Sequence, residues 1–271
     1  MTGRGLFDLE NHGPDTFVGE GPQYPWGGLY GGQIVAQALR AAAATVDEDL
    51  QVHSLRAYFI RRGDHNEPVR YEVDRIRNGR SFSTRRVVAR QAIGAILNCE
   101  ASFQRNRANV DVQFEPIPAG VPQPSDLTSD QWTPSFDRRI APAVDDGGSV
   151  HHRAWMKVSS PLGDDDLVHC CWLAYLSDDL PTDCVVRAYR RLAGADWEPE
   201  FAASLDHTIW FHGRPRVDRW HLFDFTCSVL VGGRGLSIGN VFDIDGLHIA
   251  TVAQEVLLRG SFPVTSIHQQ D

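Results

Sequence analysis

The apolar positions near the N-terminus predict an amphipathic helix from Gly31 to Ala44. They recur at intervals of three and four residues, the spacing of one helix face, at Ile34, Val35, Ala38, Leu39 and Ala42. A Gly31–Gly32 pair opens the segment, and alanines at positions 41 to 44 indicate a helix that packs closely against a neighbour.

Alternating apolar and polar residues after this helix predict a series of strands. The alternation is cleanest from Val69 to Ile76, where Val69, Tyr71 and Val73 share one face. Looser patterns predict strands at 52–59, 81–90 and 92–103. One helix followed by several antiparallel strands indicates an α+β unit with the helix on one face of the sheet.

The pattern dissolves between about 105 and 148, where six prolines fall, and then resumes. We interpret this stretch as a linker that crosses the surface between two halves. The second half predicts a helix at 181–193 and strands at 150–158, 167–176, 206–211, 220–230, 236–242 and 247–258. Asp165 and Asp166 are expected in an acidic loop that faces water.

The two halves are related to each other by an offset of 154 positions. His53 and His207, Arg80 and Arg234, and Arg105 and Arg259 are such pairs, and no gap is needed across 53–105 and 207–259. Matching order and turn positions indicate an internal duplication. We therefore predict three parts, 1–105, 106–149 and 150–271, with the two sheets joined edge to edge and a cleft between the halves.

The charge composition indicates which kinds of binding partner the protein can have. Charged residues make up 23% of the 271 residues, and the net charge of −9 disfavours a nucleic-acid partner. Arginines nevertheless gather locally, at Arg61, Arg62, Arg75, Arg77, Arg80, Arg85 and Arg86. They are either a solvated strand face or a docking patch for an anionic ligand.

Cysteine spacing and hydropathy argue against a disulfide-bonded protein, a zinc finger and a membrane protein. The five cysteines are an odd number without finger spacing, so we expect free thiols in a reducing cytoplasm. His151–His152 lack a recognisable third ligand, and no metal is expected. We find no signal peptide and no apolar run long enough to enter a membrane.

Three polar positions of the second half are not repeated in the first. These positions are Asp206, Ser228 and Gln254. At the offset of 154, their counterparts in the first half are Val52, Asp74 and Glu100. One working site and one lapsed site would leave this pattern, and so would ordinary drift. The paired His53 and His207 are interpreted as structural.

Five ordered segments carry a resemblance to a known family: 30–39 (YGGQIVAQAL), 53–64 (HSLRAYFIRRGD), 77–87 (RNGRSFSTRRV), 205–212 (LDHTIWFH) and 251–255 (TVAQE). The chain resembles the acyl-CoA thioesterase II family, the double-hotdog acyl-CoA hydrolases. The resemblance implies a double hotdog fold, an acyl-CoA substrate, no cofactor and association into a homo-oligomer. Residues 106–200 match poorly, which leaves the acyl chain length open.

The resemblance also implies a water-activating trio of Asp206, Ser228 and Gln254, with Thr226 as the alternative hydroxyl. In that scheme Asp206 is the general base for hydrolysis. Backbone N–H groups near Gly31 and Gly32 would stabilise the oxyanion, unless these glycines serve only helix packing. The other hypotheses are a hotdog enoyl-CoA hydratase and a non-catalytic acyl-CoA binding protein.

Overall fold

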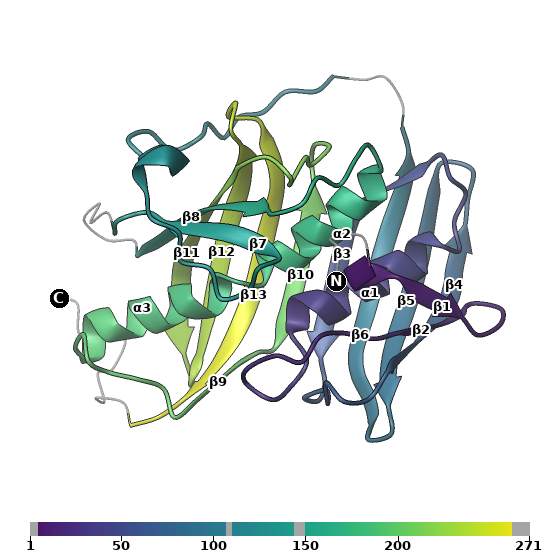
Figure 1. Ribbon diagram of the computed structural model, residues 1–271, viewed down its shortest axis with the longest axis horizontal. Coiled ribbons are helices and arrows are strands. Elements are labelled where there is room, and N and C mark those ends of the chain that lie inside the picture. Colours follow the sequence, from purple (N-terminus) through teal and green to yellow (C-terminus); the bar gives the residue numbers. More distant parts are fainter. Residues whose placement is uncertain (1–4, 107–109, 144–149, 262–271) are drawn as a thin grey trace.

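The computed structural model describes residues 5–106, 110–143 and 150–261. Its strands form one antiparallel sheet in the order β1-β2-β4-β5-β6-β3-β10-β13-β12-β11-β8-β7, with β9 paired to β13. The helices lie on one face of this sheet (Figure 1). The prediction of an α+β fold is confirmed.

The first half contains the elements β1 (Leu9–Asn11), β2 (Thr16–Gly19), α1 (Gly31–Ala43), β3 (Leu50–Phe59), β4 (Val69–Asn78), β5 (Phe82–Gln91) and β6 (Gly94–Arg105). The second half contains β7 (Phe136–Ile140), β8 (His151–Val158), α2 (Asp166–Ser177), α3 (Pro181–Ala193), β9 (Phe201–Ser204), β10 (Asp206–Phe211), β11 (His221–Val231), β12 (Arg234–Asp243) and β13 (His248–Arg259). The predicted helices α1 and α3 and the long strands appear close to their expected bounds.

The segment 167–176 is a helix, so its prediction as a strand is wrong. Every residue of α2 from His169 to Ser177 is buried, so the run shows neither a helical nor an alternating pattern. Asp165 caps the helix, because its carboxylate accepts the N–H groups of Leu167 at 3.0 Å and Val168 at 3.3 Å. The expected loop carboxylate is therefore a helix cap.

The predicted linker contains ordered structure of its own. Strand β7 pairs with β8 at the edge of the sheet, as in Arg138 opposite Met156. Trp132 donates its indole N–H to Asp179 at 2.5 Å, and Arg138 forms an ion pair with the same carboxylate at 2.8 Å. These contacts attach the segment to the junction of α2 and α3.

The two halves meet along strands β3 and β10. These strands pair antiparallel, and Leu55 lies opposite Ile209, both fully buried. The order β4-β5-β6-β3 in one half is repeated as β11-β12-β13-β10 in the other. The predicted edge-to-edge junction is confirmed, and a single sheet runs through both halves.

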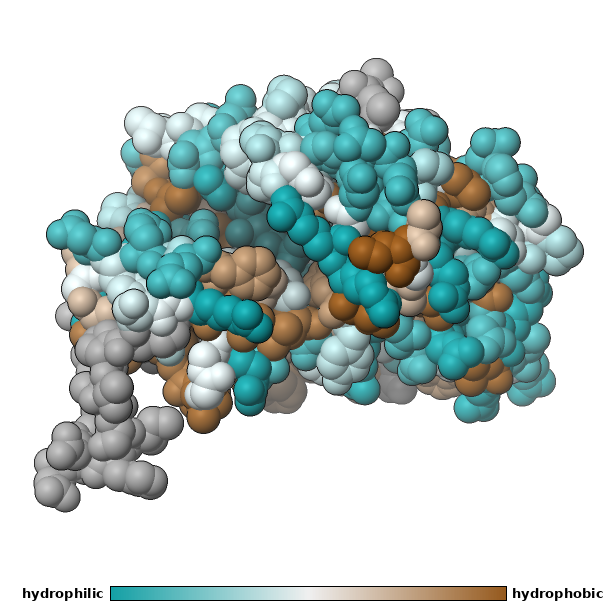
Figure 2. All heavy atoms as spheres, turned by 90° about the horizontal axis from the view of Figure 1, so that it is seen from below, coloured by the Kyte–Doolittle hydropathy of each residue, from teal (hydrophilic) through white to brown (hydrophobic). Residues whose placement is uncertain are grey.

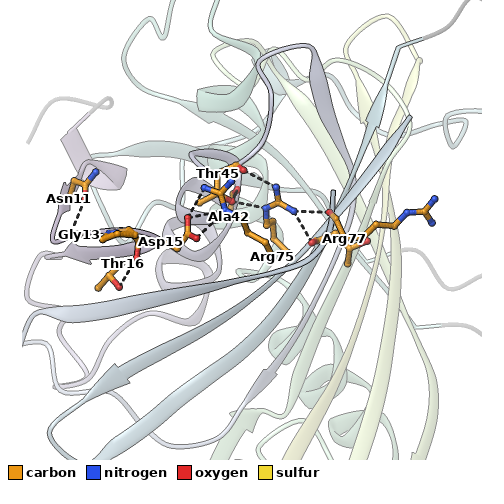
Figure 3. Close-up of polar contacts among 11 residues, drawn as sticks. Asn11, Gly13, Asp15, Thr16, Ala42, Thr45, Arg75 and Arg77 are labelled. Carbon is orange, nitrogen blue, oxygen red and sulfur yellow. Dashed lines mark hydrogen bonds and ion pairs between the residues drawn. The ribbon is translucent and has the colours of Figure 1, made fainter. Parts of the chain in front are cut away.

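A buried guanidinium secures the end of α1 in the first half. Arg85 of β5 is 2% exposed and donates to the hydroxyl and the carbonyl oxygen of Thr45, each at 2.7 Å. It also reaches the Arg77 carbonyl, while Arg75 pairs with Asp15 nearby (Figure 3). Because its donors are used inside the protein, Arg85 cannot belong to a docking patch.

All five cysteines are free thiols, as expected. Within the described ranges, no cluster of three or more His, Cys, Asp or Glu side chains could hold a metal ion. None of the described helices is long and apolar enough to cross a membrane.

Candidate active site

Gln254 projects from β13 into the layer between the sheet and the helices. Its side chain is fully buried. The amide oxygen lies 2.5 Å from His207 Nδ1, and the amide nitrogen donates to Ser204 Oγ at 2.7 Å. Gln254, Ser204 and His207 therefore form one connected polar group in an otherwise apolar layer.

An irregularity between β9 and β10 directs two of these side chains. Both strands pair with β13, but Ser204 lies opposite Val256 whereas Thr208 lies opposite Ala253. Between these two pairs, the chain from β9 to β10 contains one more residue than the facing part of β13. An extra residue of this kind is a β-bulge. The bulge brings Ser204 and His207 to the same side of the sheet as Gln254.

Asp178 completes the group from the opposite layer. It follows the last residue of α2, and Ser204 donates to its Oδ1 at 3.4 Å. The backbone N–H of Gly32 donates to its Oδ2 at 2.7 Å. Burial raises the pKa of the Asp178 carboxyl to about 7, against the opposing effect of these hydrogen bonds. A carboxyl group with this pKa is suited to take a proton near neutral pH.

The N-terminus of α1 faces the Asp178 carboxylate. A Cβ at Gly31 would lie 2.7 Å from Asp178 Oδ2 and 3.0 Å from the ring of Phe59. A Cβ at Gly32 would lie 2.4 Å from the carbonyl oxygen of Tyr175. Both glycines thus allow a close approach, and the positive end of the helix dipole points at the site.

The structure brings only part of the predicted trio together. Asp206 neighbours His207 on β10 but lies on the opposite face of the strand, and its carboxylate accepts the backbone N–H of Glu255 at 2.7 Å. Ser228 is exposed at a bulge of β11 between Cys227 and Val229. Strand β12 separates β11 from β13. Neither Asp206 nor Ser228 bonds to Gln254, and Thr226 donates instead to the Ile238 carbonyl at 3.3 Å.

Asp178 and Ser204, which the sequence analysis did not single out, are the residues that the structure connects to Gln254. The strand prediction for 167–176 hid the fact that Asp178 ends a helix and faces the start of another. Ser204 stands two residues before Asp206, directly before the LDHTIWFH segment, and that proximity was the available signal. The register count to Ser228 assumed equal turns in the two halves, but β4 and β5 join across 79–81 and β11 and β12 across 232–233.

Two family models and several known proteins match most of this chain. The family model described as "Acyl-CoA thioesterase N-terminal domain" matches residues 21–104, and "Acyl-CoA thioesterase C-terminal domain" matches 113–258. "Acyl-coenzyme A thioesterase 8" of Homo sapiens is 34% identical over 286 residues, which span 94% of this chain and 88% of that protein. "Acyl-CoA thioesterase 2" of Haemophilus influenzae is 32% identical over 279 residues, which span 94% and 96% of the two chains.

Among solved structures, the acyl-CoA thioesterase II TesB2 from Mycobacterium marinum superposes with a TM-score of 0.83. It is 34% identical in sequence, and the match covers 100% of both chains. A tesB protein of Mycobacterium avium subs paratuberculosis gives a TM-score of 0.82 at 31% identity over 95% of this chain and 98% of that one.

Proposed function

The chain belongs to the acyl-CoA thioesterase family, and from this membership we propose that it hydrolyses acyl-CoA to a free acid and CoA, using Asp178, Ser204 and Gln254. The observation that carries the proposal is the hydrogen-bonded path from Gln254 through Ser204 to the buried Asp178 carboxylate. This assignment differs from the trio suggested by resemblance, which shares only Gln254 with it.

Asp178 is the general base in this proposal. Its carboxylate removes a proton from a water molecule held between Asp178, the Ser204 hydroxyl and the Gln254 amide. A hydroxyl has one donor and two lone pairs, and an amide has both donors and an acceptor, so the two groups can orient the water. The raised pKa makes Asp178 a stronger base than an exposed aspartate.

The bond changes follow from this arrangement. The water oxygen bonds to the thioester carbon as its proton passes to Asp178, and the carbonyl oxygen becomes an oxyanion. Collapse of that intermediate breaks the carbon–sulfur bond, and the proton on Asp178 passes to the departing CoA thiolate. The Gly32 N–H already serves Asp178, so we assign the oxyanion to the Gly31 N–H, for which the described residues offer no acceptor.

The hydratase hypothesis fits the geometry less well. A hydratase of this fold would need Asp206 and His207 to face one substrate. Asp206 instead caps the N–H of Glu255, and His207 is fully buried on the other face of β10. A non-catalytic binding role gives no reason for a buried carboxyl group with a pKa near 7 beside a helix N-terminus.

Two exposed arginines support a CoA partner. Arg61 and Arg62 follow Phe59, whose ring lies beside Gly31, and no carboxylate in the described part of the chain pairs with either. Figure 2, which views the molecule from below relative to Figure 1, shows a recess among hydrophilic and hydrophobic side chains. We assign Arg61 and Arg62 to the CoA phosphates. The other arginines of the predicted patch include the buried Arg85 and the paired Arg75 and Arg86.

Release of CoA from a panel of acyl-CoA substrates, followed with a thiol reagent, tests the proposal. We expect Asp178→Asn and Ser204→Ala to lower kcat by about 100-fold or more. The matched controls Asp206→Asn and Ser228→Ala should remain within about threefold of the parent. Arg61→Ala with Arg62→Ala should raise KM several-fold at similar kcat.

The panel separates the competing assignments. Loss of turnover in the Asp206 and Ser228 variants, with full turnover in the Asp178 and Ser204 variants, would support the trio suggested by resemblance. Enoyl-CoA consumption without thiol release would support the hydratase. Tight acyl-CoA binding without any turnover would support the binding protein.

The surface of the sheet and the cysteines bear on the oligomeric state of the protein and on its cellular compartment. The outer face of the sheet carries large exposed apolar side chains, including Tyr58 at 63% and Ile76 at 55%, which a second copy could cover. We therefore propose a homo-oligomer, for which sedimentation velocity is the direct measurement. The five free thiols support a reducing compartment such as the cytoplasm.

A further inference from the structure

His207 is a fully buried histidine that the proposed mechanism does not use. Its Nδ1 lies 2.5 Å from Gln254 Oε1, and its Nε2 lies 2.8 Å from Ser177 Oγ. Both ring nitrogens therefore have a polar partner inside the apolar layer. Ser177 is the last residue of α2 and immediately precedes Asp178, so the ring joins the same two layers as the proposed site.

The hydrogen bonds of this group run in one direction. The Gln254 amide nitrogen donates to Ser204, and the Ser204 hydroxyl donates to Asp178. The amide oxygen of Gln254 is thereby left facing His207, and an oxygen can only accept. His207 Nδ1 must then carry the proton. The Ser177 hydroxyl lies 2.8 Å from His207 Nε2 and 3.1 Å from the Ala174 carbonyl oxygen, and with Nδ1 protonated its single proton is directed to the nearer Nε2.

We propose that His207, held as the Nδ1–H tautomer by Ser177, is a positioning residue that sets the orientation of the Gln254 amide for thioester hydrolysis. The proposal rests on the function proposed above. An amide turned by 180° would present its oxygen to Ser204 and its nitrogen to His207. Ser204 would then have to donate to Gln254, and its hydrogen bond to Asp178 would be lost.

The neutral state of the ring is part of the argument. Burial lowers the pKa of His207 to about 4, so the ring carries a single proton throughout the neutral range. Among the described residues, no charged side chain shifts the pKa of this ring; burial lowers it, and the hydrogen bond with Gln254 raises it. A ring with one proton specifies one amide orientation, whereas a doubly protonated ring would place a donor on Ser177 as well.

The first half offers a natural comparison. His53 occupies a bulge of β3 between Val52 and Ser54, and it is related to His207 by the repeat. Its Nε2 contacts the Ser102 hydroxyl at 2.8 Å, and its side chain is only partly buried. The bulged histidine thus occurs in both halves, but only His207 bonds to an amide that leads on to a buried carboxylate.

Kinetics of five variants test the proposal. His207→Leu removes the donor, and we expect kcat to fall by about 10- to 100-fold with KM within about twofold. His207→Asn places an amide N–H where Nδ1–H was and should recover most of that loss. The matched control His53→Leu should leave kcat unchanged. In a Gln254→Ala background, His207→Leu should cause no further loss, because the group it positions is absent.

The pH profile gives a readout that a purely structural role would not move. Loss of the donated hydrogen bonds should raise the pKa of Asp178 further, so the rising limb of kcat against pH should shift upward in His207→Leu. A second measurement needs no turnover: ¹⁵N NMR of the His207 ring should report a neutral Nδ1–H tautomer from pH 6 to 8. Melting temperatures show whether each variant is folded.

Three outcomes would overturn the proposal. The first is an Nε2–H tautomer of His207, and the second is an unchanged kcat in a folded His207→Leu variant. The third is a double variant in which the loss of kcat from His207→Leu adds in full to the loss from Gln254→Ala. If the parent enzyme releases no CoA from any substrate, the proposed function itself fails. If the parent and Gln254→Ala behave as expected and His207→Leu does not, only the role of His207 fails.

Discussion

Asp178 is an acidic residue buried without a positively charged partner. Hydrogen bonds from the Gly32 N–H, the Gln254 amide and the Ser204 hydroxyl lower its pKa, whereas burial and the neighbouring Asp179 raise it. Arg138 pairs with Asp179 rather than with Asp178. Arg138 thus neutralises one carboxylate of the pair and not the other, as the proposed role of Asp178 as a base requires.

This arrangement predicts a cost in stability at high pH. The folded protein holds the pKa of Asp178 near 7, above its unfolded value. The stability that protonation contributes is therefore complete below about pH 4 and is lost as pH rises through 7. Asp178→Asn stays neutral, so its melting temperature should exceed that of the parent by at least roughly 4 °C at pH 8. Thermal unfolding at pH 4 and pH 8 measures this difference, with the exposed Asp74→Asn as control; a gap that does not widen with pH would contradict it.

At the level of elements, the contact between α1 and α2 forms the site. The start of α1 meets the end of α2, and the absence of side chains at Gly31 and Gly32 lets their backbones approach. The opening glycines were visible in the sequence. The close contact supports the packing interpretation, and an oxyanion role for these glycines stays a prediction. The prediction of α2 was wrong because this helix is buried on all its faces, with Trp172, Leu173 and Tyr175 among the buried residues. Such a helix lacks the alternation of apolar and polar faces from which a helix is recognised in a sequence.

Gly32→Ala should separate the two helices. The added Cβ would meet the Tyr175 carbonyl oxygen at 2.4 Å, and a backbone atom cannot swing away as a side chain can. We expect a loss of about 1–3 kcal/mol in the free energy of unfolding, together with lower activity. Urea denaturation measures it, and Gly5→Ala, whose nearest contact would be 3.8 Å away, serves as the control. Equal stability of the two variants would argue against a close helix contact.

The whole molecule shows which features a sequence can specify. Strand β10 was predictable because His207, Ile209 and Phe211 alternate toward the core, and the strand order repeats in both halves. Residue correspondence between the halves was not predictable by counting. The hairpin of β5 and β6 pairs Gln91 with Gly94, whereas that of β12 and β13 pairs Phe242 with His248 across a longer turn. Bulges and turns absorb such differences, so a gapless register locates strands but does not fix which single side chains correspond.

The assembled site depends on both halves of the chain. Gly31 and Gly32 come from the first half, while Asp178, Ser204 and Gln254 come from the second. The junction of β3 with β10 holds these parts together, because Phe59 at the end of β3 lies beside Gly31. The proposed site would therefore occur once per chain, since the first half has Ser102 rather than a glutamine facing its bulged histidine.

The most direct test of the central claim is the pH dependence of kcat/KM for CoA release. This quantity reports the ionisation of groups in the free enzyme, the state that the structure represents. We predict that kcat/KM rises with pH through a midpoint near 7 and reaches a plateau above it, because Asp178 must be ionised to accept the proton of water. A flat profile between pH 5 and 9, or full activity in a folded Asp178→Asn variant, would contradict the assignment of Asp178 as the base.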